Sequence, residues 1–366
     1  MTRSLLSVVG ARPNFMKLAP LARCFAARPD VRHTTVHTGQ HYDAGMSAAF
    51  FGDLAIPPPD HDLGVGSASH AQQTAAIMQR IEPVLVATRP DLVLVYGDVN
   101  STVAAALVAA KLGLRVGHVE AGLRSGDWGM PEEINRVVTD RLSDLLFTPS
   151  RDADENLRAE GVPAERIHFV GNVMIDSLVH ALPAARSRQA LTRWGLKGRP
   201  YAVVTLHRPS NVDDPATLGG LFEALETLGR ELPVVFPVHP RTRARLVALG
   251  LCPSAGGGLR LLDPVGYLDM LGLVEAAALV ITDSGGLQEE TTFLGVPCLT
   301  VRPNTERPIT CTRGTNRLVA PAGDTLVAAA RDVLGAASGA PTCIDRWDGK
   351  TAERIARVVL DGAAFH

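Results

Sequence analysis

The stretch "ALVITDSGGLQEE" at residues 278–290 runs from an apolar segment through a Ser-Gly-Gly turn into a helical pattern. The apolar segment shows no polar alternation, which is typical of a strand buried on both faces of a parallel sheet. Gly285 and Gly286 let the backbone approach an anion closely, and the N–H groups of a helix start attract a phosphate. A helix capped by Asp283 or Ser284 has the same pattern, so both interpretations stay open at this point.

The same order of strand, turn and helix recurs along the chain. Helical patterns at 101–112, 133–142, 214–229 and 285–294 alternate with short apolar runs, which predicts an α/β fold. The candidate strands are 4–9, 31–38, 91–96, 114–119, 144–148 and 167–171 in the first half, and 201–206, 232–238, 259–262, 278–282 and 297–301 in the second.

The chain has 366 residues, which favours two domains. The alternation breaks in a polar, basic stretch near 178–199, so we predict one Rossmann-like domain over 1–178 and a second over 199–345. The remaining residues, 346–366, have an amphipathic pattern, and we predict that they form a helix that packs back on the first domain. Two such domains whose parallel sheets face a central cleft make the GT-B fold.

The composition excludes several classes of protein. Hydrophobic residues make up 46% and charged residues 20% of the chain, and the net charge of −2 gives no basic field for nucleic acid or a membrane surface. The five cysteines are scattered without a CxxC pair, which indicates reduced thiols in a cytoplasmic protein. The apolar run at the N-terminus is too short for a signal peptide, and no run is long enough for a membrane helix.

Unusual polar residues follow the predicted strands, where open α/β sheets bind ligands. Basic residues and the glycine turn suit the anion of a nucleoside diphosphate in the second half, while carboxylates concentrate in the first half. The candidates are Arg12, Lys17, Asp98, Glu120, Glu132, His207, Arg208, His239, Ser284, Gly285, Gly286 and Glu290.

Each of these residues also has a structural interpretation. A lone histidine is usually a structural hydrogen-bonding group, and a lone carboxylate is usually solvated or caps a helix. In "MPEEINR" at 130–136, Pro131 followed by two acids is a good helix start. We therefore expect one of Glu132 and Glu133 to act in chemistry and the other to cap the helix or pair with an arginine.

The sequence lacks several common cofactor motifs. It contains no HExxH, no Walker loop, and no GxGxxG after the first strand, which argues against a P-loop NTPase and a nicotinamide enzyme. We expect neither a metal nor another cofactor.

Nine ordered motifs resemble those of the non-hydrolysing UDP-N-acetylglucosamine 2-epimerases, from about residue 5 to about residue 320. They are "GARPNFMKLAPL" (10–21), "HTGQHYD" (37–43), "YGDVNST" (96–102), "HVEAGLRSGD" (118–127), "MPEEINR" (130–136), "TLHRPSN" (205–211), "PVHPRT" (237–242), "TDSGGLQEE" (282–290) and "RPNTERP" (302–308). The resemblance implies a GT-B fold, a homodimer and the interconversion of UDP-GlcNAc and UDP-ManNAc without a redox cofactor.

The resemblance also implies a mechanism and a set of roles. UDP leaves C1 as a base removes the C2 proton, and UDP then adds back to 2-acetamidoglucal with a proton delivered to the opposite face. Asp98, Glu120, Glu132 and His207 occupy the catalytic positions of the family. The positions that hold the UDP moiety correspond to Arg12, Lys17, His207, Ser284, Gly285, Gly286 and Glu290, the last at the ribose, with Arg136, His239 and Arg313 as further candidates.

Some features separate the chain from well-known members of the family. Only three residues, "WGM" at 128–130, lie between "GLRSGD" and "PEE", as in relatives that act on diacetamido-glucuronates. By contrast, "TERP" at 305–308 favours the plain GlcNAc members. Asp43 replaces a glutamine with which several members bind an activating second UDP-GlcNAc, so we expect hyperbolic kinetics. The alternatives are an epimerase of a modified UDP-sugar, a hydrolysing epimerase, a GT-B glycosyltransferase and a non-catalytic nucleotide-sugar sensor.

Overall fold

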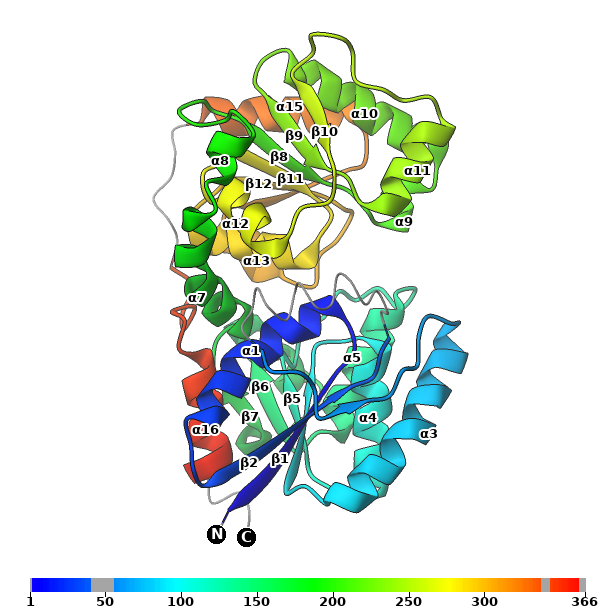
Figure 1. The fold of residues 1–366 in the computed structure, drawn as a ribbon, viewed down its shortest axis with the longest axis vertical. Coiled ribbons are helices and arrows are strands. Elements are labelled where there is room, and N and C mark those ends of the chain that lie inside the picture. The colour runs from blue at the N-terminus through cyan, green and yellow to red at the C-terminus, as the bar shows by residue number, and fades with distance from the viewer. Residues whose placement is uncertain (1, 41–55, 337–342, 362–366) are drawn as a thin grey trace. The chain divides into compact units, whose positions relative to one another are not determined.

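The computed structural model describes residues 2–40, 56–336 and 343–361, without the side chain of Arg12. The chain divides into two compact units, one formed by Met1–His180 with Asp345–His366 and the other by Ala181–Ile344. Helix α7 (Val173–Ser187) crosses from the first unit into the second. Figure 1 shows both units, and each is described here by itself.

The first unit is built on a seven-stranded parallel sheet in the order β3-β2-β1-β4-β5-β6-β7. Its central strand β4 is "LVLVY", and every residue of that strand is buried because helices cover both faces of the sheet. The strands are β1 (Arg3–Val9), β2 (Val31–His37), β3 (His61–Asp62), β4 (Leu92–Tyr96), β5 (Val116–Val119), β6 (Leu145–Thr148) and β7 (Ile167–Phe169).

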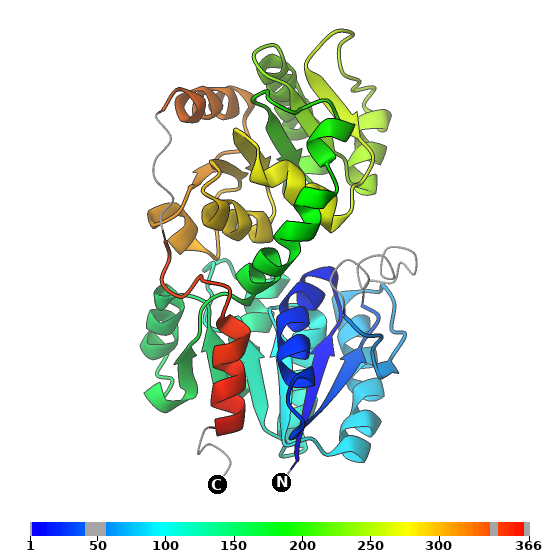
Figure 2. The ribbon, with the colours of Figure 1, turned by 60° about the vertical axis from the view of Figure 1, so that its left-hand side comes forward.

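The helices of the first unit pack in neighbouring groups. Helix α4 contacts both α3 and α5, while α1 contacts α16, so the C-terminal helix lies beside the first helix (Figure 2). The helices are α1 (Arg12–Ala26), α3 (His70–Thr88), α4 (Asn100–Lys111), α5 (Pro131–Leu142), α6 (Arg151–Ala159) and α16 (Thr351–Asp361), with a 3₁₀ turn at Ala164–Arg166.

Local sequence explains where several of these helices begin. The Ser69 hydroxyl accepts a hydrogen bond from the backbone N–H of Gln72, 3.3 Å away, and so caps α3. Helix α5 begins at Pro131, whose fixed φ suits the first helical position. The carboxylate of Asp176 accepts the N–H groups of Thr351 and Ala352 at 3.0 and 2.7 Å, which fixes the start of α16 on the first unit.

The second unit contains a six-stranded parallel sheet in the order β10-β9-β8-β11-β12-β13. The strand order reverses beside β8 and β11, the type of position where doubly wound sheets bind ligands. The strands are β8 (Ala202–Thr205), β9 (Val234–Pro237), β10 (Leu259–Leu262), β11 (Leu279–Thr282), β12 (Cys298–Val301) and β13 (Asn316–Val319).

Two apolar clusters hold the helices of the second unit against its sheet. One cluster joins α10 and α15 to one face, and the other joins α8, α12 and α13 to the opposite face (Figure 1). The helices are α8 (Ala190–Arg193), α9 (Pro209–Val212), α10 (Pro215–Gly229), α11 (Pro240–Ala248), α12 (Tyr267–Glu275), α13 (Gly285–Leu294), α14 (Pro308–Thr312) and α15 (Gly323–Gly335).

The structure confirms the predicted α/β class and the two parallel sheets. Every predicted strand coincides with an observed one, whereas β3 and β13 were not predicted. Strand β3 is two residues long, exposed and polar, so it has no apolar pattern, and "NRLV" of β13 is only half apolar. Within the described residues, no helix is both long and apolar enough to span a lipid bilayer.

Candidate active site

Lys17 and Glu120 form a buried ion pair at the carboxyl ends of the strands of the first unit. Lys17 lies on α1, and Glu120 follows β5 directly. Gly97, which follows β4, leaves room for the pair: a Cβ there would lie 2.5 Å from the Lys17 Nζ and 3.1 Å from the Glu120 Oε2. Glu120 has φ +75°, a left-handed conformation that costs a residue with a side chain about 1–3 kcal/mol.

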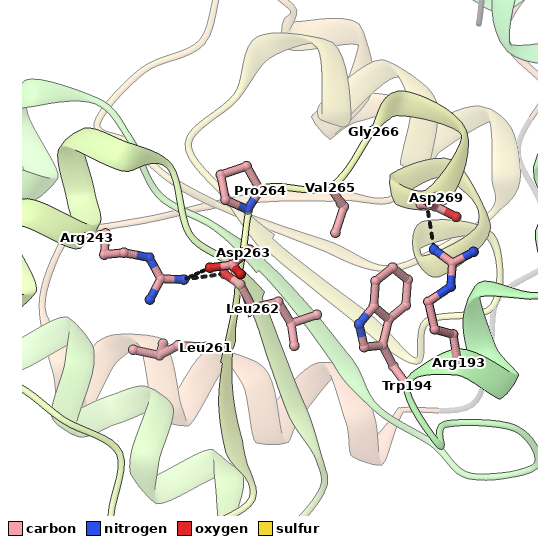
Figure 3. Close-up of a pocket in the computed structure, with 10 residues that line it drawn as sticks. All are labelled: Arg193, Trp194, Arg243, Leu261, Leu262, Asp263, Pro264, Val265, Gly266 and Asp269. Carbon is pink, nitrogen blue, oxygen red and sulfur yellow. Dashed lines mark hydrogen bonds and ion pairs between the residues drawn. The ribbon is translucent and has the colours of Figure 1, made fainter. Parts of the chain in front are cut away.

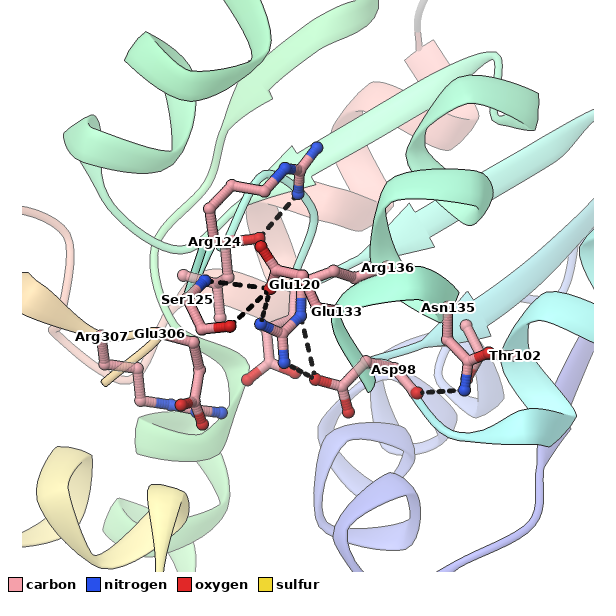
Figure 4. Close-up of polar contacts among 12 residues, drawn as sticks. Asp98, Thr102, Glu120, Arg124, Ser125, Glu133, Asn135, Arg136, Glu306 and Arg307 are labelled. Carbon is pink, nitrogen blue, oxygen red and sulfur yellow. Dashed lines mark hydrogen bonds and ion pairs between the residues drawn. The ribbon is translucent and has the colours of Figure 1, made fainter. Parts of the chain in front are cut away.

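Asp98 and Arg136 form a second pair in the same unit (Figure 4). The Arg136 guanidinium donates to the Asp98 Oδ2 from Nη2 at 2.5 Å and from Nε at 3.2 Å. Its Nη1 donates to the Glu133 Oε2 at 2.6 Å, so one buried arginine holds carboxylates from two segments. Asn135 donates to the backbone oxygen of Asp98 at 2.9 Å and fixes the same turn from α5.

The two acids in the first turn of α5 have different surroundings. Glu133 is buried and accepts the backbone N–H groups of Ser125 and Gly126, each at 2.9 Å, in addition to Arg136. The side chain of Glu132 is exposed. Glu133 therefore organises the loop before α5, and Glu132 is the acid of the pair that solvent or a ligand can reach.

His207 and Asp283 pair at the carboxyl end of the sheet in the second unit. The His207 Nδ1 lies 2.8 Å from the Asp283 Oδ1, while the other oxygen of Asp283 accepts the backbone N–H groups of His207 and Arg208 at 2.9 Å. Burial raises the pKa of Asp283, but His207 and these N–H groups outweigh burial and hold the pKa below its usual value. Asp283 thus carries the negative charge that orients the imidazole.

The N-terminus of α13 has the features of an anion site. Ser284 occupies the N-cap position, yet its side chain makes no capping hydrogen bond within the described part of the chain. A Cβ on Gly285 would lie 2.7 Å from the Arg307 Nη1 and 2.9 Å from the Glu306 Oε1. A glycine at this position therefore brings a cation close to the helix start, where the helix dipole also favours negative charge.

Arg307 is held in place by carboxylates on both sides. Its Nε lies 2.8 Å from the Glu289 Oε1, and its Nη1 pairs with Glu306. Arg302 donates to the other oxygen of Glu306 at 2.8 Å. The four side chains are buried, so the segment after β12 brings a fixed, charge-balanced network to α13.

Glu290 lies in α13 and is buried. Burial raises its pKa to about 7, the Tyr267 hydroxyl opposes this by donating to Oε1 at 3.3 Å, and neighbouring Glu289 adds to the rise. Near neutral pH its carboxyl group exists in both protonation states, so it can accept or donate a hydrogen bond.

The other predicted site residues have varied surroundings. His239 is the N-cap residue of α11, and its Nδ1 accepts the N–H of Arg241 at 3.2 Å, while its ring centroid lies 6.3 Å from that of His207. Gly286 lies in the first turn of α13, and Arg313 is exposed after α14. Arg12 begins α1, but its side chain, like the whole of Asp43, lies outside the described residues.

Sequence reasoning gave no role to several residues that hold these groups. Asp283, Tyr267, Arg302, Glu306 and Arg307 were not among the predicted site residues, whereas Glu133 pairs with Arg136, as expected of one of the two acids in "MPEEINR". Most of them lie within the motifs quoted above or directly after an apolar strand, so their positions carried a signal. Their partners are distant in sequence, which a single sequence does not reveal.

A separate cavity of about 490 Å³ lies in the second unit, beside the loop that follows β10 (Figure 3). Arg243 donates to Asp263 at 3.1 Å on one side, and Arg193 donates to Asp269 at 3.0 Å on the other. Trp194, Leu261, Leu262, Pro264 and Val265 supply the apolar part of its wall. Among the described residues, no group of three or more His, Cys, Asp or Glu side chains could hold a metal ion.

Comparison with known proteins identifies the family. The model of the UDP-N-acetylglucosamine 2-epimerase family matches residues 23–360. The UDP-2,3-diacetamido-2,3-dideoxy-D-glucuronate 2-epimerase of Pseudomonas aeruginosa is 44% identical over 90% of this chain and 92% of its own length. The UDP-N-acetylglucosamine 2-epimerase of Methanococcus maripaludis is 42% identical over 85% of this chain and 86% of its own length.

A solved structure extends this likeness to the fold. The crystal structure of the Methanocaldococcus jannaschii UDP-GlcNAc 2-epimerase in complex with UDP-GlcNAc and UDP is 39% identical, covers 98% of this chain and 100% of its own, and gives a TM-score of 0.88. The two parallel sheets agree with the GT-B-like fold of these epimerases. This chain is a member of the UDP-N-acetylglucosamine 2-epimerase family.

Proposed function

We propose that this protein epimerises a UDP-2-acetamido sugar at C2 in both directions, with UDP-N-acetylglucosamine and UDP-N-acetylmannosamine as the first candidate pair. The observation that carries this proposal is the pairing of two candidate carboxylates with separate cations: Glu120 with Lys17 and Asp98 with Arg136. An epimerase needs an acid and a base at C2. A glycosyltransferase needs no such pair at this carbon.

We propose that the second unit holds the UDP moiety. The Ser284 hydroxyl and the N–H groups of Gly285 and Gly286 bind the diphosphate, since the Ser284 side chain does not cap the helix start and Arg307 lies against Gly285. Glu290 accepts or donates hydrogen bonds at the ribose hydroxyls. Within this unit, Arg313 adds positive charge for the diphosphate and His239 adds a hydrogen bond, while Arg12 and Lys17 of the first unit are sequence-based candidates for binding the substrate.

The proposed reaction needs no external oxidant or reductant. A carboxylate removes the C2 proton, the C2–H electron pair forms the C1–C2 double bond, and the C1–O bond breaks, which gives 2-acetamidoglucal and UDP. In the second half a phosphate oxygen of UDP attacks C1, and an acid delivers a proton to the opposite face of C2. Both halves pass through an oxocarbenium-like state, which nearby carboxylates stabilise.

The roles follow from the surroundings of each residue. Asp98, Glu120 and Glu132 exchange protons with C2 or stabilise positive charge at C1, with Arg136 fixing Asp98. His207, oriented by Asp283, protonates the departing phosphate and accepts that proton again on return. Deprotonating C2 while C1–O breaks avoids a free carbanion, because the C2–H electron pair forms the C1–C2 double bond as UDP leaves with the C1–O pair.

Two specific observations bear on the identity of the sugar. The 44% identity to the Pseudomonas diacetamido-glucuronate epimerase makes UDP-2,3-diacetamido-glucuronate the second candidate substrate. Against it, the motif "RPNTERP" at 302–308 resembles that of the plain GlcNAc members of the family. We therefore rank the plain GlcNAc substrate first.

Proton NMR of UDP-GlcNAc with the purified protein in D₂O tests the function. UDP-ManNAc with deuterium at C2 and no net UDP is the expected result. Free ManNAc that accumulates in step with UDP would indicate a hydrolysing epimerase, and sugar transfer without an epimer would indicate a glycosyltransferase. If UDP-GlcNAc stays unchanged while the diacetamido-glucuronate is epimerised, the second substrate is correct.

We also propose that the chain forms a homodimer through the outer face around α5. Ile134 and Val138, one turn apart on α5, are 45% and 38% exposed, and Trp128 in the loop before this helix is 64% exposed; exposed large apolar side chains favour a protein contact. Sedimentation of the wild type should give twice the chain mass, and Ile134→Lys with Val138→Lys should give the monomer. A monomeric wild type would contradict the dimer, and a dimeric variant would contradict this interface.

A further inference from the structure

His118 and Asp140 form a fully buried pair within the first unit. His118 lies on β5 and Asp140 on α5, and each is at most 1% exposed. The His118 Nδ1 donates to the Asp140 Oδ1 at 2.6 Å, while its Nε2 donates to the backbone oxygen of Gly97 at 2.8 Å. The ring thus connects the turn after β4 to helix α5.

Both partners of His118 are acceptors. A backbone carbonyl oxygen has no proton to give, and Asp140 is ionised: burial raises its pKa, but His118 and Arg124 outweigh burial and lower it below the usual range. Each ring nitrogen therefore faces an acceptor and donates a hydrogen bond to it.

The second oxygen of Asp140 extends the connection to the turn after β5. Its Oδ2 accepts the backbone N–H of Gly122 at 3.0 Å and lies 2.7 Å from the Arg124 Nη1. Asp140 thus receives one donor from the segment before Glu120, His118, and two from the segment after it, Gly122 and Arg124. Glu120 itself has the left-handed backbone conformation that neighbouring bonds must maintain.

The geometry points to His118 and Asp140 as positioning residues that fix the two turns presenting Asp98 and Glu120 to substrate. Gly97 immediately precedes Asp98 and borders the Lys17–Glu120 pair, so a shift of its carbonyl would displace both candidate carboxylates. His118 acts only through these turns and touches no substrate. This inference rests on the proposed function, because it assigns the pair to the carboxylates of that reaction.

Three variants test this assignment. The amide of His118→Gln can donate to only one of the two acceptors, Asp140 and the Gly97 oxygen, and it turns its own oxygen toward the other. In Asp140→Asn, the amide N–H₂ group replaces an oxygen that accepts a hydrogen bond from His118 or Gly122. His33→Gln is the matched control, because His33 lies on β2 of the same sheet and bonds the Ser7 hydroxyl near the opposite end. We expect kcat to fall on the order of 10²-fold in the two test variants, as for a displaced catalytic group.

The same variants should bind UDP normally, since we place the nucleotide in the second unit. UDP affinity by calorimetry that falls in step with kcat would show a merely structural role and overturn the inference. A kcat within about threefold of the wild type would also overturn it. In the double variant His118→Gln/Asp140→Asn, kcat should fall by less than the product of the two single-variant losses, because both substitutions break the same connection.

A spectroscopic measurement separates this inference from the proposed function. Long-range ¹H–¹⁵N spectra of histidine-labelled wild type at neutral pH, with His118→Gln for assignment, should show protons on both ring nitrogens of His118. A ring with one bare nitrogen contradicts the connection, whatever the activity. Two protonated nitrogens without any epimerisation contradict only the proposed function.

Discussion

His207 and Asp283 form a close side-chain pair in the second unit, with 2.8 Å between the Nδ1 of the histidine and the Oδ1 of the aspartate. The backbone N–H of His207 donates to the other oxygen of the same carboxylate at 2.9 Å. The aspartate therefore holds the residue by ring and backbone together. An imidazole fixed through Nδ1 presents Nε2 for proton transfer, and the adjacent carboxylate stabilises the protonated ring.

Asp283→Asn tests the importance of this pair. The amide removes the negative charge and can turn an N–H₂ group toward the ring, so His207 loses its orientation and its charge partner. We expect kcat for epimerisation to fall on the order of 10²-fold or more, with UDP affinity nearly unchanged. Asp332→Asn, at an exposed ion pair of the same unit, is the control and should keep full activity. An active Asp283→Asn variant would remove His207 from the proton transfer.

Lys17→Met should destabilise the protein strongly, because it leaves the carboxylate of Glu120 buried without its cation. Breaking a buried ion pair costs about 3–5 kcal/mol of the free energy of unfolding, which urea denaturation measures. The double variant Lys17→Met/Glu120→Gln should recover most of this stability and still lack turnover. If Lys17→Met alone is as stable as the wild type, the Lys17–Glu120 pair is open to water in solution.

Glu290 should make stability depend on pH in a defined direction. Its pKa is raised from an ordinary value of 4.5 to about 7, so between these values the folded state holds a proton that the unfolded state has released. Stability attributable to Glu290 is therefore present at low pH and lost as pH rises through this window, by at most about 1.4 kcal/mol per pH unit.

Urea denaturation of the wild type and Glu290→Gln across this pH range measures the effect. The wild-type stability minus that of the variant should decline as pH rises. Glu231→Gln is the control, because Arg331 holds the pKa of Glu231 below its ordinary value and that residue does not titrate in the window. If the stability difference between the wild type and Glu290→Gln does not change with pH, the pKa of Glu290 lies outside this range.

Gly285→Ala should weaken UDP binding. The new methyl group would meet Arg307, whose guanidinium is held by Glu289 and Glu306 and cannot turn away without breaking these pairs. We expect unfolding free energy to fall by about 1–3 kcal/mol and UDP affinity, by calorimetry, to fall with it. Gly219→Ala in α10 meets no described atom within 4 Å and should instead stabilise the protein slightly. Equal UDP affinity in both variants would argue against an anion at α13.

Much of the fold could be predicted from local sequence. The continuous apolar runs identify strands buried on both faces, as at "LVLVY", because only a parallel sheet covered by helices hides every side chain. The helix starts at Pro131 and Gly285 could be read from the residues that favour them. Strands β3 and β13 lack such a pattern and depend on neighbouring strands, so no local signal reveals them.

Strand, turn and helix are local properties of the chain, so the amino-acid sequence is enough to place these chemical groups at the strand ends. Their partners follow only from the folded chain: Glu120 pairs with Lys17, Asp98 with Arg136, and His207 with Asp283. These partners lie between 38 and 103 positions apart in the chain. Parallel strands bring distant segments to one edge of a sheet, and ion pairing there depends on distances that spacing along a sequence does not encode.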